Sequence, residues 1–142
     1  MKIYLASRYI RIEEMRKVAD TLRNVGHEIT SRWINGNHQI SDDGLSAEAK
    51  EEERSRFATE DYCDLTAADC CINFTEKPRS TNSRGGRHVE FGMAVQAGIR
   101  LIVVGPRENV FHYLPFIEWY PDFQIFMEKC DLMEKSDALS LP

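Results

Sequence analysis

The chain has 142 residues, of which 42% are hydrophobic, and its formal net charge at pH 7 is −5. This length fits one domain over residues 1–142 with one sizeable core, and excludes a second full domain. The negative charge argues against binding of a nucleic acid polymer, because affinity for the phosphate backbone comes mainly from clustered cations. A small anionic ligand in a local basic pocket is still compatible with this composition.

The apolar run at the start of the sequence is too short for a signal peptide, and no later run is long enough to span a membrane. We therefore expect a cytoplasmic protein with no membrane partner. The four cysteines form no CxxC pair and have no histidine at zinc-binding spacing, so reduced structural thiols are expected, with no metal site and no cofactor. These cysteines are Cys63, Cys70, Cys71 and Cys130.

Short apolar segments alternate along the chain with segments of helical periodicity. Strands are expected at 2–7, 28–33, 70–74 and 100–104, with a weaker strand at 116–119. Helices are expected at 11–25, 47–67 and 88–97, and from about residue 122 onward. Such alternation favours parallel pairing with right-handed crossovers. The predicted fold is α/β, a three-layer sandwich around a parallel flavodoxin-like or Rossmann-like sheet of about five strands.

In an open parallel sheet, ligands bind beyond the carboxyl ends of the strands, where the strand order reverses. Three loops are expected at that edge, at 7–10, 75–87 and 105–111. The segment 34–46 is rich in Asn, Gly, Asp and Ser, which favour turns, and a loop of this length suggests a lid over a site.

The loop at 75–87 ends in residues suited to an anion, namely Ser83, Arg84, Gly85, Gly86 and Arg87. Glycine permits close approach of the backbone, the amides at a helix N-terminus attract anions, and arginine binds phosphate through two donors. A solvated surface loop has the same composition, so composition alone leaves both interpretations open.

Three carboxylates lie near the same predicted edge. Glu90 falls in the first turn of the helix after the anion loop, where the helix dipole stabilises a carboxylate, and a surface residue with no further role fits equally. Asp64 and Asp69 precede the strand at 70–74, and each is also explained as an ordinary helix-end or loop acid.

Three motifs in the first 105 residues share their order and spacing with a known family: KIYLAS, DYCDLTAADCCINF and GGRHVEFGMAVQAGIRLIVVG. The chain resembles the nucleoside 2-deoxyribosyltransferase superfamily, which includes N-hydrolases of 5-hydroxymethyl-dUMP and of CMP. Its last third resembles phage and bacterial deoxyribosyltransferase-like proteins.

The resemblance implies a small-molecule nucleoside or nucleotide substrate and a homodimer or higher homo-oligomer. It implies that Glu90 attacks the anomeric carbon, expels the base and forms a glycosyl ester. Tyr4 would position Glu90, and Asp64 would contact the sugar or assist the leaving base, with Asp69 as second choice. Either water or a second base can resolve such an ester, so hydrolysis and transfer both stay open.

One position departs from the transferase pattern. Superfamily members that act on free nucleosides have an aspartate six residues before the nucleophile, where this chain has Arg84. The hydrolases have a small phosphate-binding residue there, so the departure favours a substrate with a 5′-phosphate, which Ser7 and Arg8 would help to bind. A non-catalytic nucleotide-binding or nucleotide-sensing module is the alternative function, and an interaction subunit with a vestigial site is a third.

Overall fold

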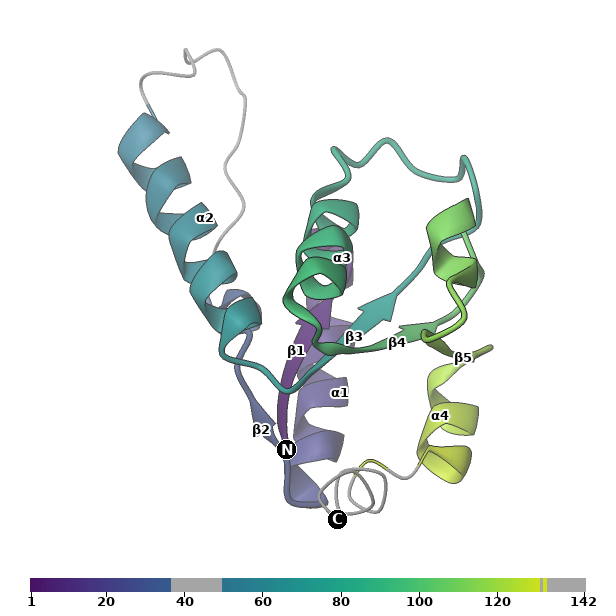
Figure 1. Cartoon of the computed structure of the whole chain (residues 1–142). Helices are drawn as coiled ribbons and strands as arrows, with labels where there is room; N and C mark the ends of the chain where they lie inside the picture. Colours follow the sequence, from purple (N-terminus) through teal and green to yellow (C-terminus); the bar gives the residue numbers. More distant parts are fainter. Residues whose placement is uncertain (37–49, 131, 133–142) are drawn as a thin grey trace.

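The computed structural model describes residues 1–36, 50–130 and 132, and a five-stranded parallel sheet forms its centre (Figure 1). The strands are β1 (Lys2–Ala6), β2 (Glu28–Ile29), β3 (Cys70–Phe74), β4 (Arg100–Val104) and β5 (Glu118–Tyr120). Their order, β2-β1-β3-β4-β5, is the predicted flavodoxin-like order. Because every neighbouring pair is parallel, all carboxyl ends lie at one edge of the sheet.

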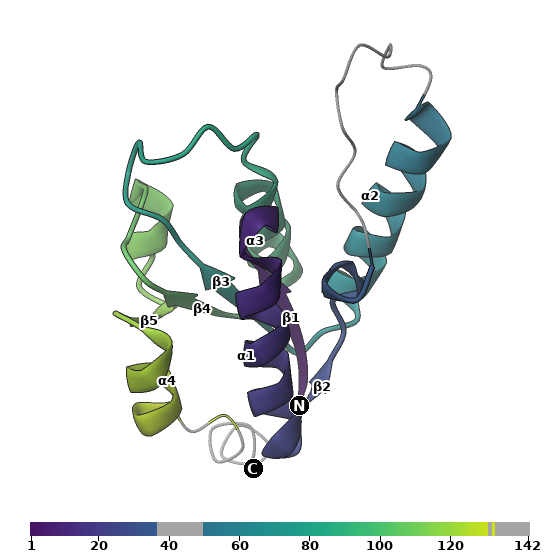
Figure 2. The same ribbon diagram turned by 180° about the vertical axis from the view of Figure 1, so that it is seen from behind.

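Helices cover both faces of the sheet, which confirms the three-layer prediction (Figures 1 and 2). One face carries α1 (Ile12–Asn24) and α4 (Phe123–Lys129), and the other carries α2 (Glu51–Thr66) and α3 (Gly86–Ala97). Three short 3-10 helices complete the described elements: η1 (Tyr9–Arg11), η2 (Arg32–Ile34) and η4 (Val110–Tyr113). Among the described residues, no helix is both long and apolar enough to cross a bilayer.

The centre of the core is β3, in which all five residues are buried. A strand covered on both faces is expected to be apolar throughout instead of alternating with polar residues, and the sequence CCINF fits this. Both β3 and β4 have the bounds predicted from the sequence. The cysteines are all free thiols, and burial raises the pKa of Cys70 to about 12.

The predicted strand at 28–33 is wrong beyond Ile29, because the chain turns into η2. The Trp33 indole donates a hydrogen bond to the Leu5 carbonyl (2.8 Å), which draws this segment over the end of β1. Arg32 contributes its backbone N–H (2.9 Å) and its guanidinium Nε (2.9 Å) to the Asp64 carboxylate of α2. The predicted lid at 34–46 lies outside the described residues from residue 37 onward.

The loops after β3 and β4 touch at Gly105, which follows β4. Gly105 has φ +117°, and a Cβ atom there would lie 2.7 Å from the Thr75 hydroxyl oxygen. Only glycine combines this backbone conformation with so close an approach. The contact brings residues 105–109 beside the loop that leads into α3.

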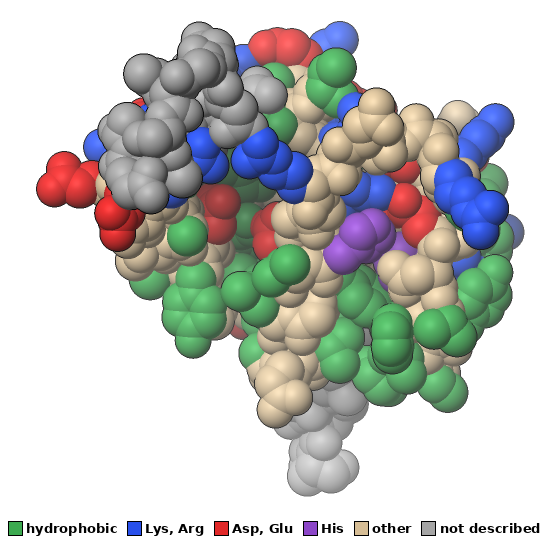
Figure 3. All heavy atoms as spheres, turned by 90° about the horizontal axis from the view of Figure 1, so that it is seen from above, with side chains coloured by type: hydrophobic (Ala, Val, Ile, Leu, Met, Phe, Trp, Pro, Cys, Tyr) green, Lys and Arg blue, Asp and Glu red, His purple; other side chains and the backbone are tan. Residues whose placement is uncertain are grey.

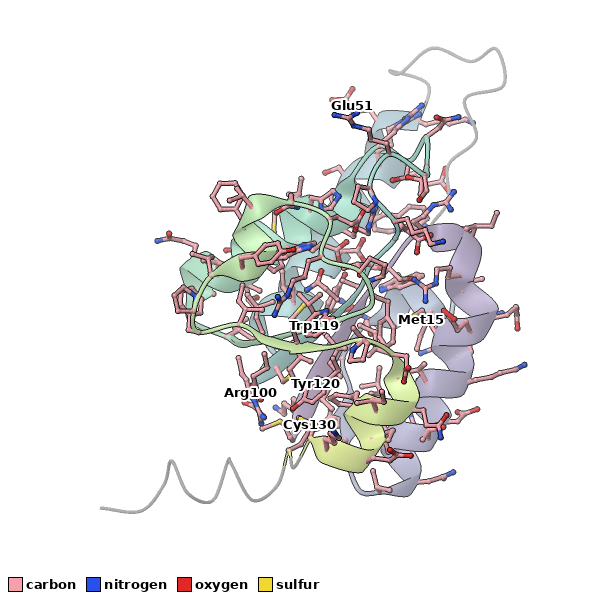
Figure 4. All side chains as sticks on the ribbon, turned by 90° about the vertical axis from the view of Figure 1, so that its right-hand side faces the viewer. Met15, Glu51, Arg100, Trp119, Tyr120 and Cys130 are labelled. Atoms are coloured by element: carbon pink, nitrogen blue, oxygen red, sulfur yellow. The ribbon has the colours of Figure 1, made fainter. Side chains whose placement is uncertain are left out.

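The edge strand β5 is fastened at the amino end of β4 (Figure 4). Arg100 donates two hydrogen bonds to the Glu118 carboxylate, at 2.6 and 2.8 Å, and its Nη2 lies 3.6 Å from the Cys130 sulfur. The Tyr120 ring packs edge-on against Phe126 of α4, with centroids 5.5 Å apart. This set of contacts holds α4 against the last two strands.

Candidate active site

A cleft of about 890 Å³ opens at the carboxyl edge of the sheet, between α2 and the loop that leads into α3. Figure 3 looks onto this edge and shows basic and acidic side chains interspersed along it, beside histidine. The lining comes from the β1–α1 connection, η2, α2, the loop before α3 and the first two turns of α3. Because α3 begins at Gly86, Glu90 lies in its second turn, not in the first turn as predicted. Its residues are Ser7, Arg8, Tyr9, Ile10, Ile12, Trp33, Arg54, Phe57, Asp61, Asn82, Ser83, Arg84, Gly85, Gly86, Arg87 and Glu90.

The Glu90 carboxylate is enclosed where α3 meets β1. Its Oε2 atom is buried and has no hydrogen-bond partner among the described residues. The hydroxyl of the fully buried Tyr4 lies beside it, short of full hydrogen-bond geometry but close enough to influence its ionisation. Burial raises the pKa of Glu90 to about 8, the Asp61 carboxylate adds to the rise, and the Tyr4 hydroxyl opposes it. The folded environment therefore favours the protonated form of Glu90.

The structure places Asp61 at the cleft, where the sequence predicted Asp64 or Asp69. Asp61 lies near enough to raise the pKa values of both Glu90 and Tyr4. Asp64 is buried in its ion pair with Arg32 and is outside the cleft lining. Asp69 accepts a hydrogen bond from the Lys2 backbone (2.9 Å), at the amino ends of the strands, because it precedes β3 instead of following it.

The predicted anion loop does line the cleft. Gly85 adopts the left-handed conformation, with φ +81°, and α3 begins at Gly86, two residues earlier than predicted. The N-cap residue, Gly85, has no side chain that could cap this helix, and the amides of a helix N-terminus are suited to bind an anion. Arg87 is buried and donates to the Ser83 hydroxyl (3.0 Å), while Arg84 lines the cleft and is exposed.

Ser7 and Arg8 also line the cleft, as predicted for the connection after β1. The Arg8 guanidinium lies 3.6 Å from the Glu76 carboxylate, which also pairs with Arg11 at 2.6 Å. Arg8 is thus one of two arginines that share a single acidic partner, and its side chain is 27% exposed. This exposure leaves part of the guanidinium accessible from the cleft.

Sequence reasoning missed the contribution of α2 to the cleft. Arg54, Phe57 and Asp61 are spaced at three and four residues, so they share one face of the helix. That spacing was the available signal, but the charged first half of α2 is equally typical of a solvated helix. Among the described residues, no group of three His, Cys, Asp or Glu side chains could hold a metal ion.

Two solved structures resemble this chain over nearly its whole length. A 2-deoxyribosyltransferase from the psychrotolerant bacterium Bacillus psychrosaccharolyticus superposes with a TM-score of 0.71 and 19% identity, covering 94% of this chain and 95% of that one. The Clostridium botulinum CMP N-glycosidase BcmB superposes with a TM-score of 0.58 and 19% identity, covering 93% and 99%. The chain has the fold of these two enzymes. No protein-family model and no curated protein sequence matches it.

The raised pKa of Glu90 predicts how the free energy of unfolding changes with pH. Between pH 4.5, the ordinary carboxyl value, and pH 8, the folded chain keeps a proton that the unfolded chain releases, so folding stability falls as the pH rises through this window. Glu90→Gln removes the titration. Its free energy of unfolding in urea, relative to the unsubstituted chain, is expected to rise by about 4 kcal/mol from pH 5 to pH 9, because each unit of the pKa shift corresponds to about 1.4 kcal/mol.

The control variant is Glu128→Gln. Glu128 is exposed and lies on α4, away from the cleft. A Glu90→Gln difference that stays constant across the pH range would show that the Glu90 carboxylate is not desolvated.

Proposed function

We propose that this chain cleaves or exchanges the N-glycosidic bond of a nucleoside or nucleoside 5′-monophosphate, through a glycosyl ester on Glu90. The observation that carries this proposal is the enclosed Glu90 carboxylate, beside Tyr4 and Asp61, in a cleft at the carboxyl edge of the sheet. The fold is shared with a 2-deoxyribosyltransferase and a CMP N-glycosidase, and the motifs resemble the same superfamily.

In the first step, an ionised Glu90 oxygen forms a bond to the anomeric carbon as the bond from that carbon to the base nitrogen breaks. The electron pair of the broken bond leaves with the base. In the second step, water or another base attacks the anomeric carbon and releases the Glu90 carboxylate, with two inversions giving net retention. The hydroxyl of Tyr4 stabilises the ionised carboxylate, as its effect on the Glu90 pKa indicates.

Asp61 is the residue that we propose to protonate the departing base. The charge of Asp61 disfavours ionisation of the neighbouring Glu90, so the proton lies on Glu90 before the reaction. Transfer of that proton from Glu90 to Asp61 produces the nucleophile and the acid at once. In hydrolysis, Asp61 then takes the proton from the attacking water.

The 5′-phosphate is proposed to lie at the α3 N-terminus, among Ser83, Arg84, Gly86 and Arg87. The N-terminal amides of α3 and the arginines of two neighbouring connections would supply the donors for such a group. The arginine at position 84 favours this assignment over a free nucleoside. It is also the observation that favours the alternative function, a nucleotide-binding or nucleotide-sensing module without turnover.

A panel of deoxynucleosides and their 5′-monophosphates, each with and without a second base, tests the proposal. Base released without an acceptor indicates hydrolysis, and base exchange indicates transfer. Glu90→Gln is expected to lower kcat by at least about 10³-fold, because it removes the nucleophile. Mass spectrometry of quenched enzyme is expected to detect a glycosyl adduct that Glu90→Gln lacks. Tight nucleotide binding with no turnover would instead establish the binding module.

The roles of Asp61 and Asp64 can be distinguished by substitution, because the two side chains have different surroundings. Asp61→Asn is expected to lower kcat by about 10²- to 10⁴-fold, the usual contribution of a general acid, with a smaller loss for bases that leave without protonation. Asp64→Asn breaks the pair with Arg32 and is expected to lower the thermal midpoint by a few degrees. A large, leaving-group-dependent loss of kcat in Asp64→Asn alone would give the acid role to Asp64.

We also propose that the chain forms a homodimer or higher homo-oligomer. Four large apolar side chains are highly exposed near η4, namely Val110, Phe111, Tyr113 and Phe116. Trp119 is 39% exposed, whereas Phe123 packs against the core. Light scattering during gel filtration is expected to give at least twice the monomer mass, and Phe111→Glu with Phe116→Glu to shift it toward monomer. A monomeric mass at high protein concentration would refute self-association.

A further inference from the structure

Glu108 connects the loop after β4 to the cleft. Its carboxylate accepts a hydrogen bond from Arg87 Nη2, and the side chains of Glu108 and Arg87 are only 8% and 6% exposed. The two residues are 21 positions apart, with Arg87 in the first turn of α3 and Glu108 in the loop after β4. A buried carboxylate requires such a partner, because desolvation of an uncompensated charge is strongly unfavourable.

The same guanidinium is held a second time, by the loop before α3. Arg87 Nη1 donates to the Ser83 hydroxyl at 3.0 Å, so Ser83 and Glu108 fix the plane of the group from two sides. Its Nε atom is buried and has no hydrogen-bond partner among the described residues. Because Arg87 is one of the residues that line the cleft, its guanidinium has an unused donor at the wall of the cleft.

Glu108 is itself held in place by His112. The Glu108 backbone N–H donates to His112 Nδ1 (3.0 Å), which assigns the ring proton to Nε2. The His112 ring is 2% exposed and packs edge-on against Phe91, next to Glu90, with centroids 4.9 Å apart. His88 is the other titratable neighbour, with its Nε2 4.0 Å from the Glu108 carboxylate. The cluster therefore ties the β4 loop to the first turns of α3.

We propose that Glu108 is a positioning residue, which orients the Arg87 guanidinium for the phosphate of a nucleotide substrate. This inference rests on the proposed function for the identity of the ligand. The carboxylate of Glu108 compensates the charge of Arg87. The pair therefore adds little net positive charge to the site, and its main contribution to phosphate binding is the fixed orientation of the guanidinium donors. Selectivity for a phosphorylated substrate thus depends on a residue outside the cleft lining.

The orientation of Arg87 is testable without substrate. In ¹⁵N NMR, the Arg87 Nε–H signal is assigned by its loss in Arg87→Lys, and its hydrogen exchange is expected to be slow. Glu108→Ala is expected to exchange at least about tenfold faster, whereas Glu108→Gln stays near the unsubstituted protein because its amide oxygen still accepts from Arg87. Equal exchange in Glu108→Ala and the unsubstituted protein overturns the proposal, whether or not the protein is an enzyme.

The ligand measurement uses calorimetry with inorganic phosphate and with a 2′-deoxynucleoside 5′-monophosphate. Glu108→Ala is expected to weaken binding of both by at least about tenfold, with Glu108→Gln near the unsubstituted value and affinity for the unphosphorylated nucleoside unchanged. In turnover of the monophosphate, KM is expected to rise more than kcat falls. Phosphate binding that is unchanged in Glu108→Ala, or tighter in Glu108→Gln, overturns the positioning role.

The matched control is Glu118→Ala, which removes the carboxylate partner of Arg100 at the amino end of the sheet. It is expected to lower stability and leave both ligand affinities unchanged. If Glu108→Ala does not fold, Glu108→Asp replaces it, since it keeps the charge but withdraws the carboxylate by one methylene group, with the same direction expected. If the unsubstituted protein binds no nucleotide, the proposed function fails, and the exchange measurement still decides the role of Glu108.

Discussion

The burial of β3 on both faces is the constraint from which the rest of the molecule follows. A strand covered on both sides needs a helical layer above and below it, and the connections between its parallel neighbours supply those layers. Parallel pairing then brings the ends of β1, β3 and β4 to one edge. The topology of the sheet alone therefore brings together loops that are distant in sequence, whatever residues those loops contain.

The enclosure of Glu90 is a direct product of that arrangement. Its helix, α3, packs on β1, β3 and β4, so the second turn of α3, which carries Glu90, lies near the carboxyl end of β1, where the carboxylate meets Tyr4. The opposite wall comes from Asp61 of α2, a helix that contacts α3. Desolvation disfavours the ionised form of the Glu90 carboxylate, and the nearby Tyr4 hydroxyl stabilises that form. A group balanced in this way is suited to alternate between neutral acid and nucleophile.

Local signals in the sequence were sufficient where structure is local. The runs at 70–74 and 100–104 are short and mostly apolar, and each is followed by a polar residue or glycine. Both strands were placed correctly. The end of β2 was misplaced because it is decided by contacts from elsewhere, Trp33 with Leu5 and Arg32 with Asp64. Asp61 was missed for a related reason, since a charged helix face looks the same whether it meets water or a cleft.

The anion loop shows what its amino-acid composition can predict about the site and what it cannot. Its arginines and glycines predicted a basic site, yet composition could not reveal that Arg87 is paired with Glu108, because that pairing depends on the register of β3 with β4. Pairing changes the character of the site. An uncompensated buried arginine would attract any anion, whereas one fixed by Ser83 and Glu108 offers a single direction of approach. The acidic chain thereby holds a cationic group in its cleft with a defined orientation, which favours recognition by geometry over recognition by charge.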